Sequence, residues 1–276
     1  MLLNQENILN KINPKNSYLI SGPSGCGKTS LALEIIKRTI EDIDPKNSFT
    51  FPLNYPDYHY LLGGNVEDIK ELLVKLNQKP YYKKHFVLLD EINKLSIEGQ
   101  NLLLKTLEES DVFFVLVSND NTKVLNTLFS RTYKITPVLF KEEDMLSLIN
   151  ARYNSNENYS IGYAKSVSKL STGSLGKAIK YIENPIYKEF IEELENISTQ
   201  NFFLLSNKYK DYKEERDEFF FLIESHIRNM MIFSNKRNDY FNLVVTLDNY
   251  KKDLLNNANI QMIYQNVFSE LIRLSK

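Results

Sequence analysis

The sequence predicts an α/β fold with a parallel sheet and helices on both faces, followed by a helical region. Three observations predict it. A glycine-rich loop, residues 21–30, lies between a short apolar run and a segment with apolar residues at helical spacing. Two continuous apolar runs, 86–89 and 112–117, are typical of strands buried on both faces. After Pro137 only helical spacing remains. We therefore expect three domains, at residues 1–137, 138–185 and 186–276.

The first domain is expected to alternate strands with helices. We predict strands at 17–21, 48–53, 86–89, 112–117 and 133–135. We predict helices at 2–12, 28–42 and 68–76, one that begins at an N-cap on Ser96 and runs past Leu107, and one that Thr122 caps and that ends at Phe129. Such alternation specifies a parallel sheet, because each helical crossover returns the chain to the same edge.

The region after Pro137 is expected to be helical throughout. Short helices are predicted at 142–149, 161–170 and 174–182. From Ile186 onward the chain is rich in aromatic residues, with asparagine-rich breaks near 234–242 and 255–259.

The composition excludes several classes of site. The one cysteine, Cys26, rules out a disulfide framework and a cysteine-based zinc site, and it fits a reducing, cytoplasmic location. The three histidines lie far apart without metal-ligand spacing. A net charge of −1 argues against a broadly basic nucleic-acid-binding protein. No apolar run is long enough for a membrane span, and we expect no signal peptide.

The glycine-rich loop matches the phosphate-binding template at every required position. Gly22 is followed by four residues and then by Gly27, Lys28 and Thr29. Its glycines let the backbone curl around an anion, and the helix N-terminus adds positive partial charge. Lys28 is expected to reach the β- and γ-phosphates, and Thr29 to hold Mg²⁺. A glycine-rich turn that only opens a helix is the alternative. The predicted nucleotide-binding residues here are Gly22, Pro23, Ser24, Gly25, Cys26, Gly27, Lys28, Thr29 and Ser30.

Acidic and polar residues close the next two buried strands. Asp90 is placed to reach Mg²⁺, usually through water, and Glu91 to take a proton from an attacking water. An N-cap for the next helix is the alternative for this pair. Asn119 closes the following strand and is a candidate to orient the water, although asparagine is also common in turns. Arg131 follows a helix without an obvious partner nearby in sequence, and it can equally bind the carbonyls at that helix end.

One stretch is recognisable as a whole, residues 85–135, HFVLLDEINKLSIEGQNLLLKTLEESDVFFVLVSNDNTKVLNTLFSRTYKI. It resembles the clamp-loader AAA+ ATPases, with the delta-prime and gamma/tau subunits of bacterial DNA polymerase III nearest and replication factor C small subunits more distant. Residues 172–182, TGSLGKAIKYI, resemble the lid motif of this family. The resemblance covers roughly residues 17–185.

The resemblance implies a fold, a chemistry and partners. It implies an AAA+ domain, a helical lid over 138–185 and a helical collar that holds a pentamer together. ATP and Mg²⁺ are the implied cofactors, without zinc. The implied partners are other clamp-loader subunits, a sliding clamp and primer–template DNA, whose phosphates Lys105 and Lys123 are weak candidates to contact.

The resemblance also implies roles for single residues. Asp90 positions the metal, Glu91 is the catalytic base and Asn119 is the first sensor. Arg131 is implied to be an arginine finger, which acts in trans by completing the site of a neighbouring subunit.

The sequence departs from the family pattern in three respects. The usual Ser-Arg-Cys reads Ser-Arg-Thr, which keeps the arginine. The cysteines of a zinc module are missing. Gly176 stands where ATP-hydrolysing relatives often carry a second-sensor arginine, and Lys177, one residue on, is the candidate substitute for nucleotide binding.

Three functions stay open at this point. The leading hypothesis is an ATPase subunit of a sliding-clamp loader. Gly176 favours a second hypothesis, an assembly subunit that binds nucleotide without turnover, while Glu91 and the intact loop oppose it. A helicase loader is a third, which the "TLEE" and "SRT" elements disfavour.

Overall fold

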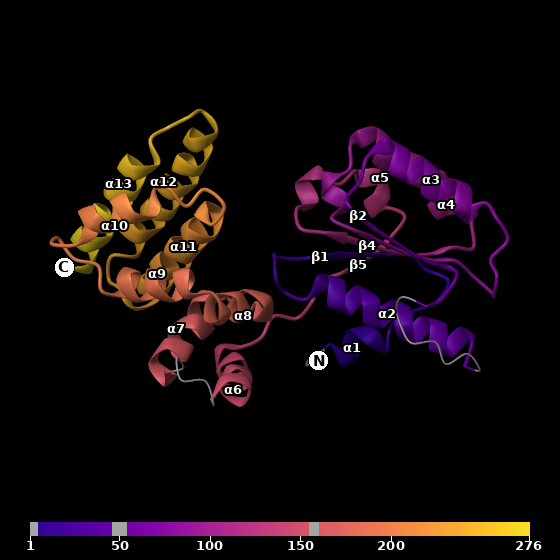
Figure 1. The fold of residues 1–276 in the computed structure, drawn as a ribbon, viewed down its shortest axis with the longest axis horizontal. Helices are drawn as coiled ribbons and strands as arrows, with labels where there is room; N and C mark the ends of the chain where they lie inside the picture. The colour runs from indigo at the N-terminus through magenta and orange to yellow at the C-terminus, as the bar shows by residue number, and fades with distance from the viewer. Residues whose placement is uncertain (1–4, 46–53, 155–159) are drawn as a thin grey trace. The chain divides into compact units, whose positions relative to one another are not determined.

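The chain divides into two compact units. The computed structural model describes residues 5–45, 54–154 and 160–276 (Figure 1). The units are Met1–Leu139 and Phe140–Lys276, and each has a hydrophobic core of its own. The first unit ends two residues after the predicted boundary at 137. The predicted boundary at 185 lies within the second unit, whose helices share one core, so separate lid and collar domains stay a prediction.

The first unit contains a parallel five-stranded sheet in the order β2-β3-β4-β1-β5. Its strands are β1 (Tyr18–Ser21), β2 (Tyr58–Leu62), β3 (Phe86–Asp90), β4 (Phe113–Ser118) and β5 (Tyr133–Ile135). Leu19 of β1 pairs with Leu116 of β4, and Leu88 of β3 pairs with Val115 of β4. Since β4 lies between β1 and β3, the segments that follow these three strands meet at one edge of the sheet.

Helices cover both faces of this sheet (Figure 1). One face packs against α1 (Glu6–Leu9) and α2 (Lys28–Ile43), and the other against α3 (Val66–Leu76), α4 (Ile97–Glu109) and α5 (Asn126–Phe129). Neighbouring residues of one strand point to opposite cores, as Ile20 and Leu19 do. The predicted fold class is confirmed.

Local side-chain contacts set the beginnings of two helices. Ser96 Oγ accepts a hydrogen bond from Gly99 N at 3.1 Å, which confirms the predicted N-cap of α4. Asn65 and Asp68 exchange side-chain-to-backbone hydrogen bonds at the start of α3, so the two residues form a capping box.

Three predicted elements of the first unit need comment. The helix predicted at 2–12 is shorter, because among the described residues it spans only Glu6–Leu9. The predicted cap on Thr122 is wrong, since Asp120 Oδ1 accepts from Thr122 N and forms a turn there (η2, Asn121–Lys123). Helix α5 therefore begins only at Asn126. The strand predicted at 48–53 lies outside the described residues.

The sequence analysis did not predict strand β2, which spans Tyr58–Leu62. It is an edge strand, and its side chains are half-buried or exposed. A run of this kind lacks the continuous apolar character that identifies a strand in the middle of a parallel sheet.

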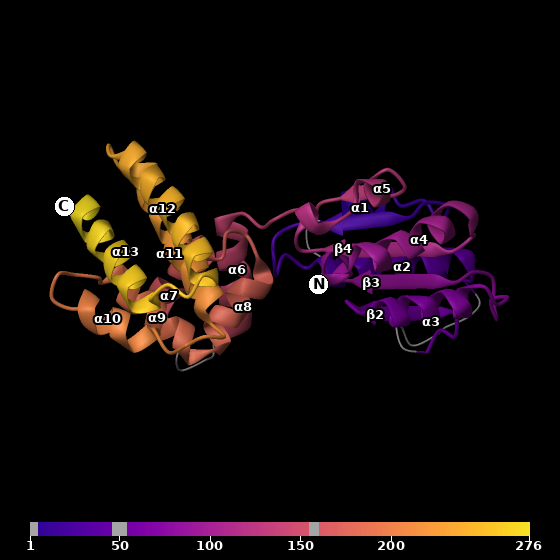
Figure 2. The same cartoon turned by 90° about the horizontal axis from the view of Figure 1, so that it is seen from above.

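The second unit is entirely helical over its described residues (Figure 1, Figure 2). Its helices are α6 (Glu142–Tyr153), α7 (Ile161–Leu170), α8 (Leu175–Glu183), α9 (Pro185–Glu195), α10 (Phe202–Tyr209), α11 (Arg216–Phe233), α12 (Arg237–Leu255) and α13 (Ile260–Ser275). Aromatic rings fill much of its core, as where Phe190 stacks on Phe219 at 4.3 Å between ring centroids. Helices α6, α7 and α8 were predicted individually, whereas α9 to α13 were predicted only as one helical region with two asparagine-rich breaks, of which the first is shorter than expected. Among the described helices, none has the length and apolar character that a membrane span requires.

A half-buried histidine on α11 gives the second unit a pH dependence. Burial lowers the pKa of His226 to about 4, below the value of about 6.5 of an unfolded chain. Between these values the unfolded chain binds more protons, so the free energy of unfolding falls as the pH drops from about 6.5 to about 4. We expect His226→Gln to remove part of this loss, on the order of 1–3 kcal/mol. Urea denaturation of both proteins at about pH 7 and about pH 4.5 tests this, and equal losses would contradict it.

Candidate nucleotide-binding site

The glycine-rich loop joins the end of β1 to the first turn of α2. Gly27 is the N-cap residue of α2 and has a φ of 84°, and Gly25 has a φ of 77°. Residues with a Cβ are strained in this left-handed region, so the loop conformation depends on glycine at these two positions. Much of the loop is exposed to solvent. The start of α2 thus presents backbone N–H groups and a positive dipole end where an anion has access.

Lys28 is the buried cation of this loop. Its Nζ donates hydrogen bonds to Gly22 O at 2.8 Å and to Pro23 O at 2.6 Å. Burial lowers the pKa of the Lys28 ammonium, against the opposing effects of the nearby Cys26 thiol and Asp90 carboxylate. The ammonium is therefore held within the curl of the loop, where it could contact a bound phosphate.

The two predicted magnesium ligands contact each other directly. Thr29 Oγ1 donates a hydrogen bond to Asp90 Oδ2 at 2.7 Å, although the residues are 61 positions apart. A hydroxyl and a carboxylate oxygen are ligands that suit Mg²⁺, and Thr29 itself belongs to the phosphate loop. The donor set fits a magnesium ion bound between Thr29, Asp90 and a nucleotide phosphate.

Glu91 begins a sharp turn immediately after β3. Its φ is 54° and its ψ 43°, a left-handed conformation that is uncommon for glutamate. Glu91 N donates to Asp90 Oδ1 at 2.8 Å. The side chain is held at both oxygens, by Lys94 Nζ at 2.6 Å and by Asn119 Nδ2 at 3.3 Å. The turn thus brings the Glu91 carboxylate and the Asn119 amide together.

Two polar residues that the sequence reading missed support this arrangement. Asn93 Oδ1 accepts from Asn119 N at 3.0 Å, which fixes the segment that carries the Asn119 side chain. Lys94 pairs with Glu91, as described above. Both residues belong to η1 (Ile92–Lys94), the short turn directly after the predicted base. Their nearness in sequence to Glu91 was the available signal.

Gln100 is a third residue that was missed. Its side chain is 1% exposed and lies on α4. Its amide donates to Leu95 O at 3.2 Å and to Lys123 O at 2.8 Å, and accepts from Leu125 N at 2.9 Å. Gln100 therefore ties the start of α4 to the segment after β4. A glutamine next to the apolar positions of a helix was the signal in the sequence.

Arg131 contacts a different set of residues. Its Nη1 donates to Thr127 O at 2.9 Å and to Ser130 Oγ at 3.3 Å, and its Nη2 forms an ion pair with Glu108 of α4. The contact with Thr127 O is the helix-end interaction that the sequence left open. The partner Glu108 lies 23 positions upstream and was not foreseen.

Lys177, the candidate substitute for a second sensor, lies in the second unit. Its Nζ is 2.9 Å from Glu218 Oε1, and its side chain is 10% exposed. Burial acts to raise the pKa of Glu218, but hydrogen bonds from Tyr181 and Lys177 outweigh it and hold the pKa below its usual value. The Lys177 ammonium is thus bound within its own unit.

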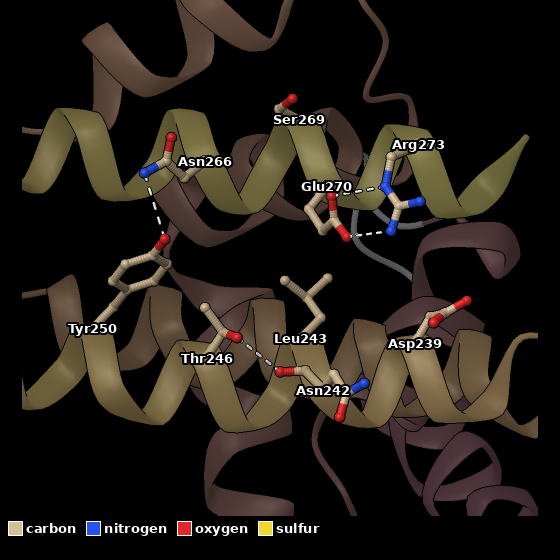
Figure 3. Close-up of a pocket in the computed structure, with 9 residues that line it drawn as sticks. All are labelled: Asp239, Asn242, Leu243, Thr246, Tyr250, Asn266, Ser269, Glu270 and Arg273. Carbon is tan, nitrogen blue, oxygen red and sulfur yellow. Dashed lines mark hydrogen bonds and ion pairs between the residues drawn. The ribbon is translucent and has the colours of Figure 1, made fainter.

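The second unit also has a groove between α12 and α13 (Figure 3). Its volume is about 460 Å³, and Glu270 and Arg273 pair with each other on one wall. The lining residues are Asp239, Asn242, Leu243, Thr246, Tyr250, Asn266, Ser269, Glu270 and Arg273. The lining combines two carboxylates with an arginine that is already paired, which does not suit a polyphosphate. The predicted nucleotide-binding residues lie elsewhere.

Comparisons with known proteins agree with this picture. The profile of the family described as "DNA polymerase III, delta subunit" matches residues 2–139. The gamma subunit of DNA polymerase III from Buchnera aphidicola subsp. Schizaphis graminum is 26% identical over 245 residues, which cover 80% of this chain and 64% of that protein. The gamma/tau subunit from Mycoplasma genitalium is 30% identical over 141 residues, 45% of this chain and 24% of that protein. The chain thus spans less than two thirds of either relative.

A solved structure shares the fold over the full chain. It is a DNA polymerase III gamma subunit-related protein from Thermotoga maritima, with a TM-score of 0.58 and 16% identity. The match covers 100% of this chain and 99% of that one, and at this identity it speaks for the fold alone. Since the family profile covers half of the chain, we conclude that the chain belongs to the DNA polymerase III delta and gamma/tau clamp-loader family, among the AAA+ proteins.

Proposed function

We propose that the chain is an ATP-binding and ATP-hydrolysing subunit of a sliding-clamp loader. The observation that carries this proposal is the Thr29–Asp90 hydrogen bond of 2.7 Å beside the buried Lys28. It joins a phosphate-binding loop to the acidic end of β3. Bound ATP would replace the carbonyl contacts of Lys28, and Mg²⁺, held by Thr29 and by Asp90 directly or through water, would neutralise phosphate charge.

The proposed roles of the remaining residues follow from their placement. Asn119 lies between the phosphate loop and Glu91 in strand order, and its amide would orient the attacking water. Glu91 would accept the proton of that water. The Glu91 carboxylate must leave Lys94 for this, because the ion pair occupies one of its two oxygens. Arg131 would complete the site of a neighbouring subunit.

The partners of this function are proposed from family membership. The relatives found are subunits of DNA polymerase III. We propose that the chain assembles with other clamp-loader subunits, binds a sliding clamp and contacts primer–template DNA. Lys105 and Lys123 are exposed and remain candidates for phosphate contacts, although each lies within ion-pair distance of an acid on its own segment, Glu109 at 3.8 Å and Asp120 at 3.7 Å.

Lys28→Ala tests the nucleotide site. We expect ATP affinity in the presence of Mg²⁺ to fall about 10- to 100-fold, because the variant loses charge-assisted hydrogen bonds to phosphate. Isothermal titration calorimetry measures the affinity, and circular dichroism verifies that the variant is folded. Lys37→Ala is the matched control, since Lys37 lies exposed on the same helix. Equal ATP affinity in the folded Lys28→Ala protein would remove the site assignment.

Two residues of the second unit, Gly176 and Lys177, support a second candidate function, nucleotide binding without turnover. Gly176 replaces the second sensor, and the Lys177 ammonium is bound to Glu218. These observations favour a subunit that binds ATP without turnover and contributes only Arg131 to a neighbour. A phosphate-release assay on the assembled complex separates the two functions, with the neighbours' own phosphate-loop lysines replaced by alanine. Remaining turnover supports hydrolysis by this chain, and its loss supports the second function.

A further inference from the structure

The proposed finger is engaged within its own chain by a carboxylate. Glu108 lies in the last turn of α4 and pairs with Arg131 Nη2. The Arg131 side chain is 29% exposed and that of Glu108 is 48% exposed. The adjacent acid, Glu109, pairs instead with Lys105 at 3.8 Å. Glu108 therefore stands apart from its neighbour as the acidic partner of the guanidinium.

The donors of Arg131 are largely occupied in this conformation. A guanidinium carries five N–H groups. Both on Nη1 are used by Thr127 O and Ser130 Oγ, and one on Nη2 by Glu108. The Nε group is buried and has no hydrogen-bond partner among the described residues. At most one N–H is left to face outward, whereas arginine typically binds phosphate through two.

Charge leads to the same result. Arginine stabilises a transferring phosphoryl group through its positive charge, and a carboxylate at contact distance offsets that charge. Arg131 in its observed conformation therefore offers a neighbouring nucleotide little of either its charge or its hydrogen bonds. The guanidinium has to leave Glu108 before it acts.

We propose that Glu108 is a positioning residue that restrains Arg131. It slows hydrolysis at the neighbouring site until the γ-phosphate bound there displaces Glu108 from the guanidinium. The proposal rests on the proposed function, because it concerns the regulation of the same composite site. The γ-phosphate carries more negative charge than one carboxylate, so a closely docked neighbour outcompetes Glu108 for the guanidinium. A loosely docked neighbour does not, so premature hydrolysis is suppressed.

Glu108→Gln tests the restraint in the assembled complex. The substitution keeps the shape and removes the charge, so we expect kcat at the neighbouring site to rise about two- to fivefold with KM for ATP nearly unchanged. The rise should vanish in the Arg131→Ala background, because Glu108 acts only through that arginine. Glu109→Gln is the control and should leave kcat unchanged. An unchanged or lowered kcat in Glu108→Gln, or a rise that persists without Arg131, overturns the proposal.

A second measurement needs only the isolated chain. Phenylglyoxal modifies arginine that is free to react, and mass spectrometry follows each site. We expect Arg131 to react several-fold faster in Glu108→Gln than in the wild type or Glu109→Gln, with Arg38 as the internal reference because Glu6 and Glu34 hold it. Equal rates at Arg131 overturn the restraint. If instead Arg131→Ala leaves the neighbour's hydrolysis intact, the finger role has failed, while the phenylglyoxal rates still decide whether Glu108 restrains the arginine.

Discussion

Glu91→Gln is expected to lower ATP turnover of the assembled protein by about 10²- to 10⁴-fold while ATP still binds, because glutamine has nearly the same shape but cannot accept a proton. In the structure both carboxylate oxygens of Glu91 are held, one by Lys94 and one by Asn119. An amide can retain the contact with Asn119. The variant should therefore keep the geometry of the site and trap the ATP-bound assembly.

Steady-state phosphate release and ATP titration measure the two halves of this prediction. Glu98→Gln is the matched control, since Glu98 is an exposed acid in the first turn of α4. It should leave both quantities unchanged. Undiminished hydrolysis in assembled Glu91→Gln, with the neighbours' sites disabled, would exclude Glu91 as the base.

Arg131→Ala is expected to leave the chain's own ATP affinity almost unchanged and to lower hydrolysis at the neighbouring site by about 10³- to 10⁵-fold. The contacts of Arg131 run to Glu108, Thr127 and Ser130 and not to Lys28 or Asp90. Its charge therefore reaches a transferring phosphate only if another subunit supplies that phosphate. Arg38→Ala is the control, because Arg38 is an ion-paired arginine of the same unit.

Mixing variants reveals where the finger acts. Arg131→Ala and Lys28→Ala subunits each lack one half of a composite site, and an interface between an intact Lys28 and an intact Arg131 restores a complete pair. If the site is homo-oligomeric, the mixture recovers activity that neither variant shows alone. If a different subunit is the neighbour, rescue fails and only that partner's rate falls. Full activity of monomeric Arg131→Ala would exclude a finger in trans.

The sequence predicted the parts of the candidate site that depend on local chemistry. The loop template predicted Lys28 as a phosphate ligand and Thr29 as a magnesium ligand. The apolar run at 86–89 predicted that Asp90 ends a buried strand. Because parallel strands bring their carboxyl ends to one edge, the closeness of Asp90, Glu91 and Asn119 could also be foreseen. The structure places these residues together through the Thr29–Asp90 and Asn119–Glu91 contacts.

The features that the sequence analysis did not predict are either exposed or set by contacts between residues distant in sequence. Strand β2 has no apolar run because it lies at the edge of the sheet. The Arg131–Glu108 pair joins α4 to the segment after α5, and its sequence separation gives no signal. The turn at Thr122 was mistaken for a helix start because Asp120 Oδ1, two residues earlier, accepts hydrogen bonds from both the backbone N–H and the hydroxyl of Thr122.

The left-handed backbone conformation of Glu91 creates a trade-off between thermostability and activity at this position. A residue with a Cβ costs about 1–2 kcal/mol in such a conformation, and glycine avoids this cost. Heat-selected variants of this protein should therefore accumulate glycine at position 91 and lose the proposed base with it. Stabilised versions that keep turnover have to be sought at other positions, with Glu91 held fixed during selection.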